Sequence, residues 1–207
     1  YQEDSDFKVS DIEIDIINNF TNFYLRFDGK KRKFFINGAS RHSPLNAALS
    51  VATAMYFGCP LSNIKERLKS IDLPERRLAI SKSLSGSILI DDSYNSNPAS
   101  LKNAVDSLEG LNRKKICILG DMKELGSDSQ KIHQEMYEYI SERVDQIFCI
   151  GDEWSTCSPN EKQDLSIFEN QDDLYSHLIS IIDKKTILLV KGSRSTRMDL
   201  LADKLKE

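Results

Sequence analysis

Hydrophobic and polar positions alternate with a period of two along the first part of the chain. Ile12-Glu13-Ile14-Asp15-Ile16 alternates, residues 23–27 follow the same pattern, and Asp28-Gly29 is a hairpin signal before residues 33–36. This pattern predicts a small antiparallel β meander over residues 9–37. Since it is short for an independent hydrophobic core, we expect it to be the edge of something larger.

Two amphipathic helices are predicted next, each with apolar residues along one face. The residues that share a face are Leu45, Leu49, Ala52 and Tyr56 in the first helix and Leu61, Ile64, Leu68 and Ile71 in the second. A proline and three charged residues follow at positions 74–77. We place a domain boundary there, with residues 1–75 in one domain and residues 76–207 in another.

Beyond this boundary, short apolar runs alternate with amphipathic helices. The runs lie at residues 88–90, 116–119, 147–150 and 187–190. Each is typical of a strand buried on both faces. Strands and helices alternating at this spacing predict right-handed βαβ units and an α/β fold with a Rossmann-like, doubly wound, mostly parallel sheet.

Composition narrows the class of protein. The 207 residues carry a net charge of −4 with both signs interspersed, and 40% are hydrophobic. We therefore expect a globular protein and no nucleic-acid partner, since a sequence-independent binder needs a basic face. No run approaches the roughly 18 apolar residues that span a bilayer, and the first residues lack the pattern of a signal peptide. We expect a cytoplasmic monomer without membrane insertion.

Four cysteines, Cys59, Cys117, Cys149 and Cys157, show no CxxC spacing, and Cys117 and Cys149 lie in apolar, strand-like runs. We expect reduced, buried thiols rather than a metal site or disulfides.

Polar or glycine-containing turns follow the predicted strands. They are residues 91–98, residues 120–126, Gly151-Asp152 and residues 191–194. All would lie at one edge of a parallel sheet, where ligands bind in such folds. Carboxylates, amides, lysine and arginine beside helix amino termini suit an anionic or zwitterionic ligand with a ribose or ammonium group.

Each of these positions also has a purely structural interpretation. Asn97 before Pro98 is an ordinary helix N-cap, and we weigh this interpretation equally with function. The glycines at 120, 126, 151 and 192 could be there only because turns need permissive residues. Asp91 and Asp92 are harder to explain structurally, because adjacent carboxylates repel unless a partner or ligand offsets them. We therefore favour a functional role for Asp92.

The histidines give weaker signals. His133 flanks an apolar helix face, which favours a structural role, and His177 indicates only a surface helix. His42 and Asn46 lie about one helical turn apart, but Ser43 before Pro44 also fits simple capping. The 207 residues contain no GxxxxGK[ST] phosphate loop, GxGxxG turn, GxSxG elbow or HExxH pair.

Taken together, the motifs resemble the Mur ligases of peptidoglycan synthesis, and within them the MurF type. Residues 91–98, DDSYNSNP, are similar to that type's DDSYNANP, and residues 118–126, ILGDMKELG, to its LGDMxELG. His133 and Lys191-Gly192-Ser193-Arg194 follow in the same order. Residues 41–49 resemble GxHNxxNALAA less closely, and residues 74–78 resemble the PxGRL hinge.

The resemblance implies an ATP-dependent amide ligase. ATP would phosphorylate the terminal carboxylate of UDP-MurNAc-tripeptide, and the amine of D-Ala-D-Ala would attack the acyl phosphate. ATP and magnesium would be bound mainly by a central domain with a phosphate loop. On this resemblance, residues 1–75 are the tail of that central domain and residues 76–207 the carboxyl-terminal ligase domain, and we expect the chain to be an inactive fragment of the enzyme.

The resemblance also implies site residues. Asn46 would meet the adenine with His42 beside it, Arg77 the ribose and phosphates, and Asp92 the ribose hydroxyls. The remaining residues would line the same nucleotide edge or hold the dipeptide: Tyr94, Asn95 and Asn97 at the nucleotide, and Asp121, Glu124, Lys191, Ser193 and Arg194 at the dipeptide. No catalytic residue and no metal ligand is assigned.

Two positions depart from the family pattern. Ser43 stands where the family has asparagine, and Arg76 where it has glycine, which permits backbone angles that arginine resists. Two alternatives stay open: a Mur-type ligase for another amino acid or peptide, and a catalytically silent binding module.

Overall fold

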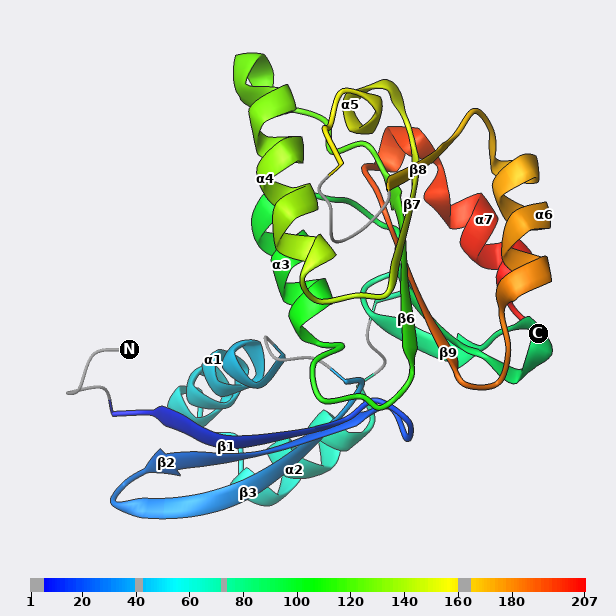
Figure 1. The fold of residues 1–207 in the computed structure, drawn as a ribbon. Helices are drawn as coiled ribbons and strands as arrows, with labels where there is room; N and C mark the ends of the chain where they lie inside the picture. The colour runs from blue at the N-terminus through cyan, green and yellow to red at the C-terminus, as the bar shows by residue number, and fades with distance from the viewer. Residues whose placement is uncertain (1–5, 40–42, 72–73, 160–164) are drawn as a thin grey trace. The chain divides into compact units, whose positions relative to one another are not determined.

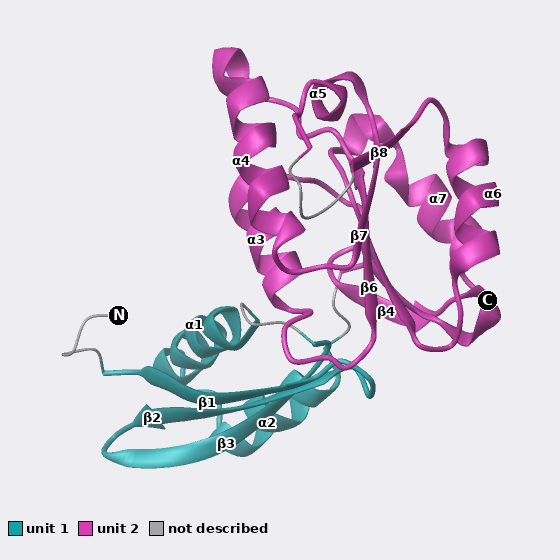
Figure 2. Ribbon diagram, in the orientation of Figure 1, with its two compact units in different colours: residues 1–73 teal, residues 74–207 magenta. Residues whose placement is uncertain are grey.

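The chain folds into two compact units, residues 1–73 and residues 74–207 (Figure 2). The computed structural model describes residues 6–39, 43–71, 74–159 and 165–207. The division falls two residues before the boundary placed from the sequence. The role of each unit as a domain stays a prediction.

Unit 1 is a three-stranded antiparallel sheet with two helices, as the sequence predicted (Figure 1). Along the middle strand, Phe23, Leu25 and Phe27 are buried, whereas Tyr24 and Arg26 between them point to the other face. The buried side chains form one core with residues of both helices. The elements, in chain order, are β1 (Lys8–Asp15), β2 (Phe20–Phe27), β3 (Lys30–Asn37), α1 (Ser43–Tyr56) and α2 (Leu61–Lys69).

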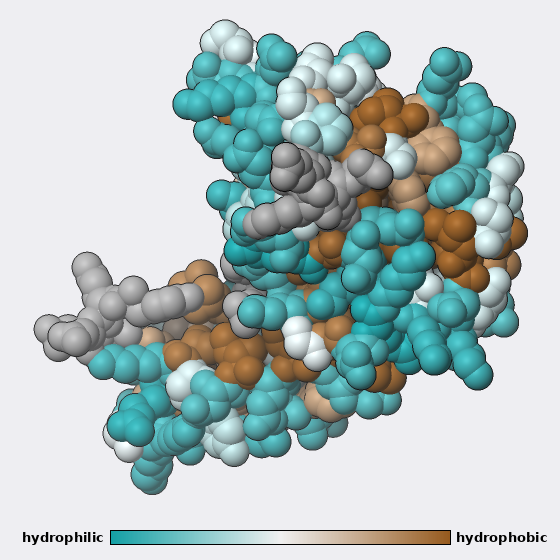
Figure 3. Space-filling view, in the orientation of Figure 1, coloured by the Kyte–Doolittle hydropathy of each residue, from teal (hydrophilic) through white to brown (hydrophobic). Residues whose placement is uncertain are grey.

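The buried face of α1 is not the face marked by Leu45, Leu49, Ala52 and Tyr56. Leu49 is 71% exposed and Tyr56 87% exposed, and Figure 3 shows hydrophobic surface over this helix. The buried residues of α1 are Pro44, Ala47, Ala48 and Val51. Small side chains let the helix approach the phenylalanines of the sheet closely, which leaves the larger apolar residues outside.

Unit 2 contains a six-stranded sheet in the order β4-β5-β9-β6-β7-β8. All neighbouring strands are parallel except β4 and β5, so the predicted Rossmann-like, mostly parallel sheet is confirmed. The strands are β4 (Ala79–Lys82), β5 (Ile88–Asp92), β6 (Lys114–Gly120), β7 (Gln146–Ile150), β8 (Leu165–Phe168) and β9 (Thr186–Lys191).

Helices cover both faces of this sheet (Figure 1). α3 and α4 lie on one face, and α6 and α7 lie on the other, where their apolar residues join one core with Leu89, Ile118 and Leu188. The helices of unit 2 are α3 (Pro98–Asp106), α4 (Ser129–Ser141), α5 (Asp152–Ser155), α6 (Gln171–Ile181) and α7 (Met198–Leu205), with 3₁₀ turns at Leu84–Gly86, Gly126–Asp128 and Arg194–Thr196.

The two outer strands, β4 and β8, were not predicted. Their residues are mostly half-buried and each strand is four residues long. Continuous apolar runs predict strands that are buried on both faces, and edge strands with one neighbour do not need such runs. The sequence therefore predicted the four central strands and missed both edges.

Candidate functional site

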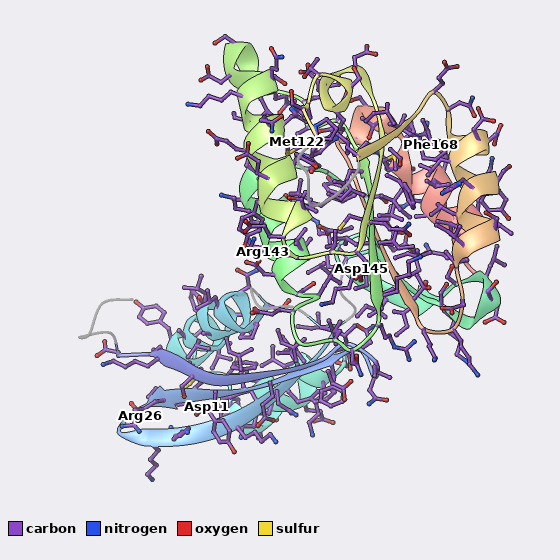
Figure 4. All side chains as sticks on the ribbon, viewed as in Figure 1. Asp11, Arg26, Met122, Arg143, Asp145 and Phe168 are labelled. Carbon is purple, nitrogen blue, oxygen red and sulfur yellow. The ribbon has the colours of Figure 1, made fainter. Side chains whose placement is uncertain are left out.

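A cavity of about 460 Å³ opens where β5, β9 and β6 end. Figure 4 shows the direction of the sheet: Met122 and Phe168 lie at its carboxyl end, and Asp145 lies at its amino end. The helices that follow β5 and β6 cover one face, whereas the helix after β9 covers the other. This is the topological switch point at which ligands bind in doubly wound sheets. The lining residues are Asn95, Lys123, Glu124, Ser193, Arg194, Ser195 and Arg197.

Hydrogen bonds through Ser193 join the three loops of the cavity. The Lys123 backbone N–H donates to Ser193 Oγ at 2.8 Å, and the Ser193 N–H donates to the Asp121 carbonyl at 3.0 Å. Ser193 Oγ donates in turn to the Ser96 carbonyl at 3.4 Å. The predicted dipeptide residue Ser193 is thus also the residue that sets the distance between the loops.

The adjacent carboxylates Asp91 and Asp92 each have a lysine partner from a distant part of the chain. Lys206 Nζ lies 3.2 Å from Asp91 Oδ2, and Lys191 Nζ lies 2.5 Å from Asp92 Oδ2. Asp91 is fully buried and also accepts hydrogen bonds from the N–H and Oγ of Ser93. The repulsion expected from the sequence is therefore offset within the protein itself.

The Asp92–Lys191 pair lies in a water-poor environment. Burial raises the pKa of the Asp92 carboxyl and lowers the pKa of the Lys191 ammonium, and their mutual attraction opposes both shifts. Lys191 also donates to the Asn95 carbonyl at 2.8 Å and does not line the cavity. Asp92 Oδ1 accepts the Leu78 N–H at 3.0 Å. Since each carboxylate oxygen has two acceptor sites, Asp92 retains capacity for a hydroxyl donor.

Arg77 and Tyr94 of the predicted nucleotide edge meet directly. The Arg77 guanidinium lies 4.4 Å from the centre of the Tyr94 ring, and both side chains are exposed. An arginine over an aromatic ring forms a flat, charged surface that suits a phosphorylated or planar ligand.

The capping interpretation of Asn97 is confirmed. Its side chain accepts the Ser100 N–H at 2.9 Å, and Ser100 Oγ accepts the Asn97 N–H at 3.1 Å, which completes a capping box. Asn95 is exposed and lines the cavity beside residues predicted for the dipeptide. The assignment of Asn95 to the nucleotide stays a prediction.

The loop after β6 is fixed by buried polar contacts. Asp121 is 3% exposed, and its carboxylate accepts from Lys123 Nζ at 2.9 Å, which raises the pKa of Lys123. His133 is fully buried, and its Nε2 accepts the Met122 N–H at 3.0 Å while Nδ1 contacts the Ser129 carbonyl at 2.8 Å. Trp154 packs edge-on against His133. The predicted structural role of His133 follows from these contacts.

Gly120 and Gly192 serve close packing rather than unusual backbone angles. A Cβ atom on Gly120 would lie 2.5 Å from Thr196 Oγ1, and one on Gly192 would lie 2.6 Å from the same atom. Neither glycine has a positive φ, so the conformational explanation from the sequence is wrong for these two. The ends of β6 and β9 accept only glycine because the turn at Thr196 crosses them.

One buried carboxylate, Asp199, pairs with three arginines of unit 2. Asp199 Oδ2 lies 2.7 Å from Arg76 Nη1 and 3.1 Å from Arg194 Nη1, and its Oδ1 lies 3.3 Å from Arg197 Nε. Arg76, which stands where the family has glycine, keeps a left-handed backbone with φ of 61°. Its ion pairs with Asp199 and Asp203 offset part of the strain of that conformation.

Two of the predicted residues, Asn46 and His42, belong to unit 1. Asn46 is exposed on α1 of unit 1, and His42 lies outside the described residues. The described residues hold no group of three or more His, Cys, Asp or Glu that could bind a metal ion, and no helix among them is long and apolar enough to cross a membrane. All four cysteines are free, but Cys59 is exposed, which corrects the expectation that every thiol is buried.

Lys123, Ser195 and Arg197 line the cavity and were missed from the sequence. Lys123 lies in the turn of residues 120–126, and Ser195 and Arg197 directly follow the turn of residues 191–194. Following the last turn to the start of α7 at Met198 would have found Ser195 and Arg197.

Comparison with known proteins identifies the family. Residues 76–194 match the family model described as Mur ligase, glutamate ligase domain. The chain is 30% identical over 188 residues to the UDP-N-acetylmuramoyl-tripeptide–D-alanyl-D-alanine ligase of Bacillus subtilis, which covers 86% of this chain and 41% of that protein. It is 33% identical to the Haemophilus influenzae protein of the same name, covering 80% of this chain and 37% of that one.

Solved structures agree with these matches. MurF from Acinetobacter baumannii superposes with a TM-score of 0.83 at 29% identity, covering 98% of this chain and 45% of that chain. The chain thus spans about two-fifths of the length of the curated relatives named above. It belongs to the Mur ligase family, whose model described as the glutamate ligase domain matches residues 76–194, within unit 2.

Proposed function

We propose that this chain carries the acceptor-binding part of an ATP-dependent amide ligase that adds D-Ala-D-Ala to UDP-MurNAc-tripeptide. The observation that carries the proposal is the cavity at the switch point, where Glu124, Lys123, Arg194 and Arg197 place both signs of charge around one space. A dipeptide is a zwitterion, so its two ends need opposite partners. The relatives named for this reaction support the choice of substrate.

For the dipeptide, we assign direct contacts to Ser193, Arg194 and Glu124, which line the cavity. Asp121 acts through Lys123, to which it is hydrogen-bonded. Lys191 is 2% exposed and bound to Asp92 and Asn95, so its proposed role is to position these two residues.

For the nucleotide, we assign Asp92 to the ribose hydroxyls, the Arg77–Tyr94 pair to the ribose and phosphates, and Asn46 to the adenine. Asp92 fits its role because its carboxylate can accept further hydrogen bonds. ATP, with magnesium, would supply the phosphoryl group that activates the tripeptide carboxylate.

The residues of this chain would contribute to catalysis by positioning. Attack of the dipeptide amine on an acyl phosphate forms the amide and releases phosphate, and the reaction depends on alignment and on exclusion of water. A cavity whose loops are fixed through Ser193 and His133 provides a preorganised site of this kind. We place the reaction in the cytoplasmic steps of precursor synthesis and expect a monomer.

The test uses the protein expressed from the complete reading frame that contains these 207 residues. Phosphate release should require UDP-MurNAc-tripeptide, ATP and D-Ala-D-Ala together. Equal turnover with an unrelated amino acid would favour a Mur-type ligase of other specificity, and no turnover with any acceptor would favour a silent binding module. The 207-residue chain alone should bind ATP weakly or undetectably, and tight magnesium-dependent binding would contradict the assigned division of roles.

A further inference from the structure

Two residues of the cavity have backbone angles that ordinary side chains avoid. Glu124 has φ of 66° and Arg197 has φ of 51°, both in the left-handed region that favours glycine. Non-glycine residues remain in this region only where the surrounding structure requires it, and such residues cluster at ligand sites. These two carry opposite charges and line the same cavity.

Contacts on both backbone and side chain hold Arg197 in place. Its carbonyl accepts from Gln171 Nε2 at 3.0 Å, and its N–H donates to the Arg194 carbonyl at 3.3 Å. Its Nε donates to Asp199 Oδ1 at 3.3 Å, yet the side chain is 55% exposed. A guanidinium carries several further N–H donors in a planar fork, and these stay available to a ligand.

The wall that carries Arg197 has an excess of positive charge. Asp199, whose side chain is 4% exposed, is the shared partner of Arg76, Arg194 and Arg197. Asp203 forms an ion pair with Arg76, but it also forms one with Lys206. It therefore offsets only part of the positive charge of Arg76. One buried carboxylate cannot neutralise the two guanidinium groups that face the cavity, so this wall attracts an anion.

We propose that Arg197 is the residue that binds the terminal carboxylate of the incoming dipeptide, with Asp199 as its positioning residue and Glu124 attracting the ammonium end. Arginine matches a carboxylate with two parallel hydrogen bonds, whereas Lys123 is already bound to Asp121. The inference rests on the proposed function and adds the group that selects an acceptor with a free carboxylate.

The decisive variant is Arg197→Gly, because glycine adopts the left-handed backbone freely and the change removes only the side chain. Arg197→Lys keeps the positive charge but loses the planar guanidinium that can form two parallel hydrogen bonds with a carboxylate. Arg113→Ala is the matched control, since Arg113 lies before β6 at the opposite edge of the sheet. Thermal unfolding of each variant checks that the fold is intact.

The measurement compares D-Ala-D-Ala with D-Ala-D-alaninamide, which lacks the carboxylate charge, in phosphate release by the protein from the complete reading frame. Arg197→Gly should raise KM for D-Ala-D-Ala roughly tenfold to hundredfold with kcat and the KM for ATP unchanged. It should leave the amide unaffected, so that the preference for the acid is lost. The KM of Arg197→Lys for D-Ala-D-Ala should lie between those of the parent protein and Arg197→Gly. The KM of Arg113→Ala should equal that of the parent protein.

An Arg197→Gly protein that keeps the full preference for the acid over the amide would overturn the inference and leave the proposed function intact. A parent protein that turns over no D-Ala-D-Ala at all would overturn the proposed function, and the inference with it. A purely structural role for Arg197 would change turnover of acid and amide equally, which also contradicts the inference.

Discussion

The two sheets of this protein bury their residues in different ways. In unit 1, Phe23 and Leu25 of β2 face helices on one side, while Tyr24 and Arg26 face away. In unit 2, every residue of β9 is buried, and the candidate polar residues lie at the carboxyl ends of the strands, as Asp92 and Lys191 do, or in the loops that follow them. A sheet covered on both faces has only its edges left for ligands, which explains why most candidate residues gather at the carboxyl edge of unit 2.

The difference extends to how charges are held. The lysines on the strands of unit 1, such as Lys33 on β3, are exposed to water. Unit 2 buries Lys191 against Asp92 and Asp91 against Lys206. Buried pairs of this kind depend on both members, so the carboxyl edge should be far more sensitive to charge removal than the sheet of unit 1.

The largest effect is expected for Lys191→Ala. Removing this ammonium leaves the Asp92 carboxylate buried without its partner, and we expect a loss of about 3–5 kcal/mol in the free energy of unfolding. Chemical denaturation measures it, with Lys33→Ala expected within about 0.5 kcal/mol of the parent.

The double substitution Asp92→Asn with Lys191→Met should recover most of this loss, because it removes both charges. A loss below about 1 kcal/mol for Lys191→Ala alone would show that the pair contributes little.

Alanine substitution should lower the free energy of unfolding at two glycines, Gly120 and Gly29, for different reasons. Gly120→Ala places a Cβ 2.5 Å from Thr196 Oγ1, and we expect a loss of about 1–3 kcal/mol from overpacking. Gly29 in unit 1 has φ of 67° and open space around it, so Gly29→Ala should cost about 1 kcal/mol.

Thermal or chemical unfolding of four variants separates the two causes. Thr196→Ala should partly rescue Gly120→Ala, and Gly29→Asn should be milder than Gly29→Ala because asparagine tolerates the left-handed region. If Thr196→Ala restores no stability and Gly29→Asn is no milder than Gly29→Ala, overpacking at Gly120 and backbone strain at Gly29 are not the causes.

A smaller change in the free energy of unfolding is expected for substitutions of Arg76, where relief of backbone strain opposes the loss of ion pairs. Arg76→Gly relieves a left-handed backbone, worth about 1 kcal/mol, and loses the ion pairs to Asp199 and Asp203. The net change in unfolding free energy should stay within about 1 kcal/mol, since Asp199 keeps Arg194 and Arg197. Arg76→Ala loses the ion pairs without relieving the strain, so it should be the less stable of the two by about 1 kcal/mol.

The smallest effect on stability is expected for Cys59→Ser, within about 0.5 kcal/mol, although it should abolish rapid thiol labelling. Cys59 is exposed in unit 1, whereas Cys117, Cys149 and Cys157 are buried. Burial raises the pKa of Cys117 to about 12 and that of Cys157 to about 11. These thiols stay protonated at pH 8, and only the thiolate reacts, so one thiol per native chain should label quickly. Fast labelling of a second thiol would contradict the burial in unit 2.

The sequence predicted the central strands well because residues buried on both faces must form continuous apolar runs, as residues 187–190 do. It failed for β8 and for the buried face of α1, because edge strands need few apolar residues and alanines count little in an apolar pattern. The fold class could be predicted because the hydrophobic pattern along the chain shows strands and helices in alternation.

For the candidate site, the sequence by itself determined the types of residues at the strand ends: the carboxylates at 91 and 92, the loop of Asp121 and Glu124, and the turn of Ser193 and Arg194. Only the tertiary structure decided their partners. Lys191 and Lys206 lie 99 and 115 residues from the carboxylates that they contact, and Asp199 gathers arginines from two ends of unit 2. Residue type and local turns are properties of neighbouring positions, whereas the pairing of charges depends on strand order, which brings β9 and α7 beside β5 only in the folded chain.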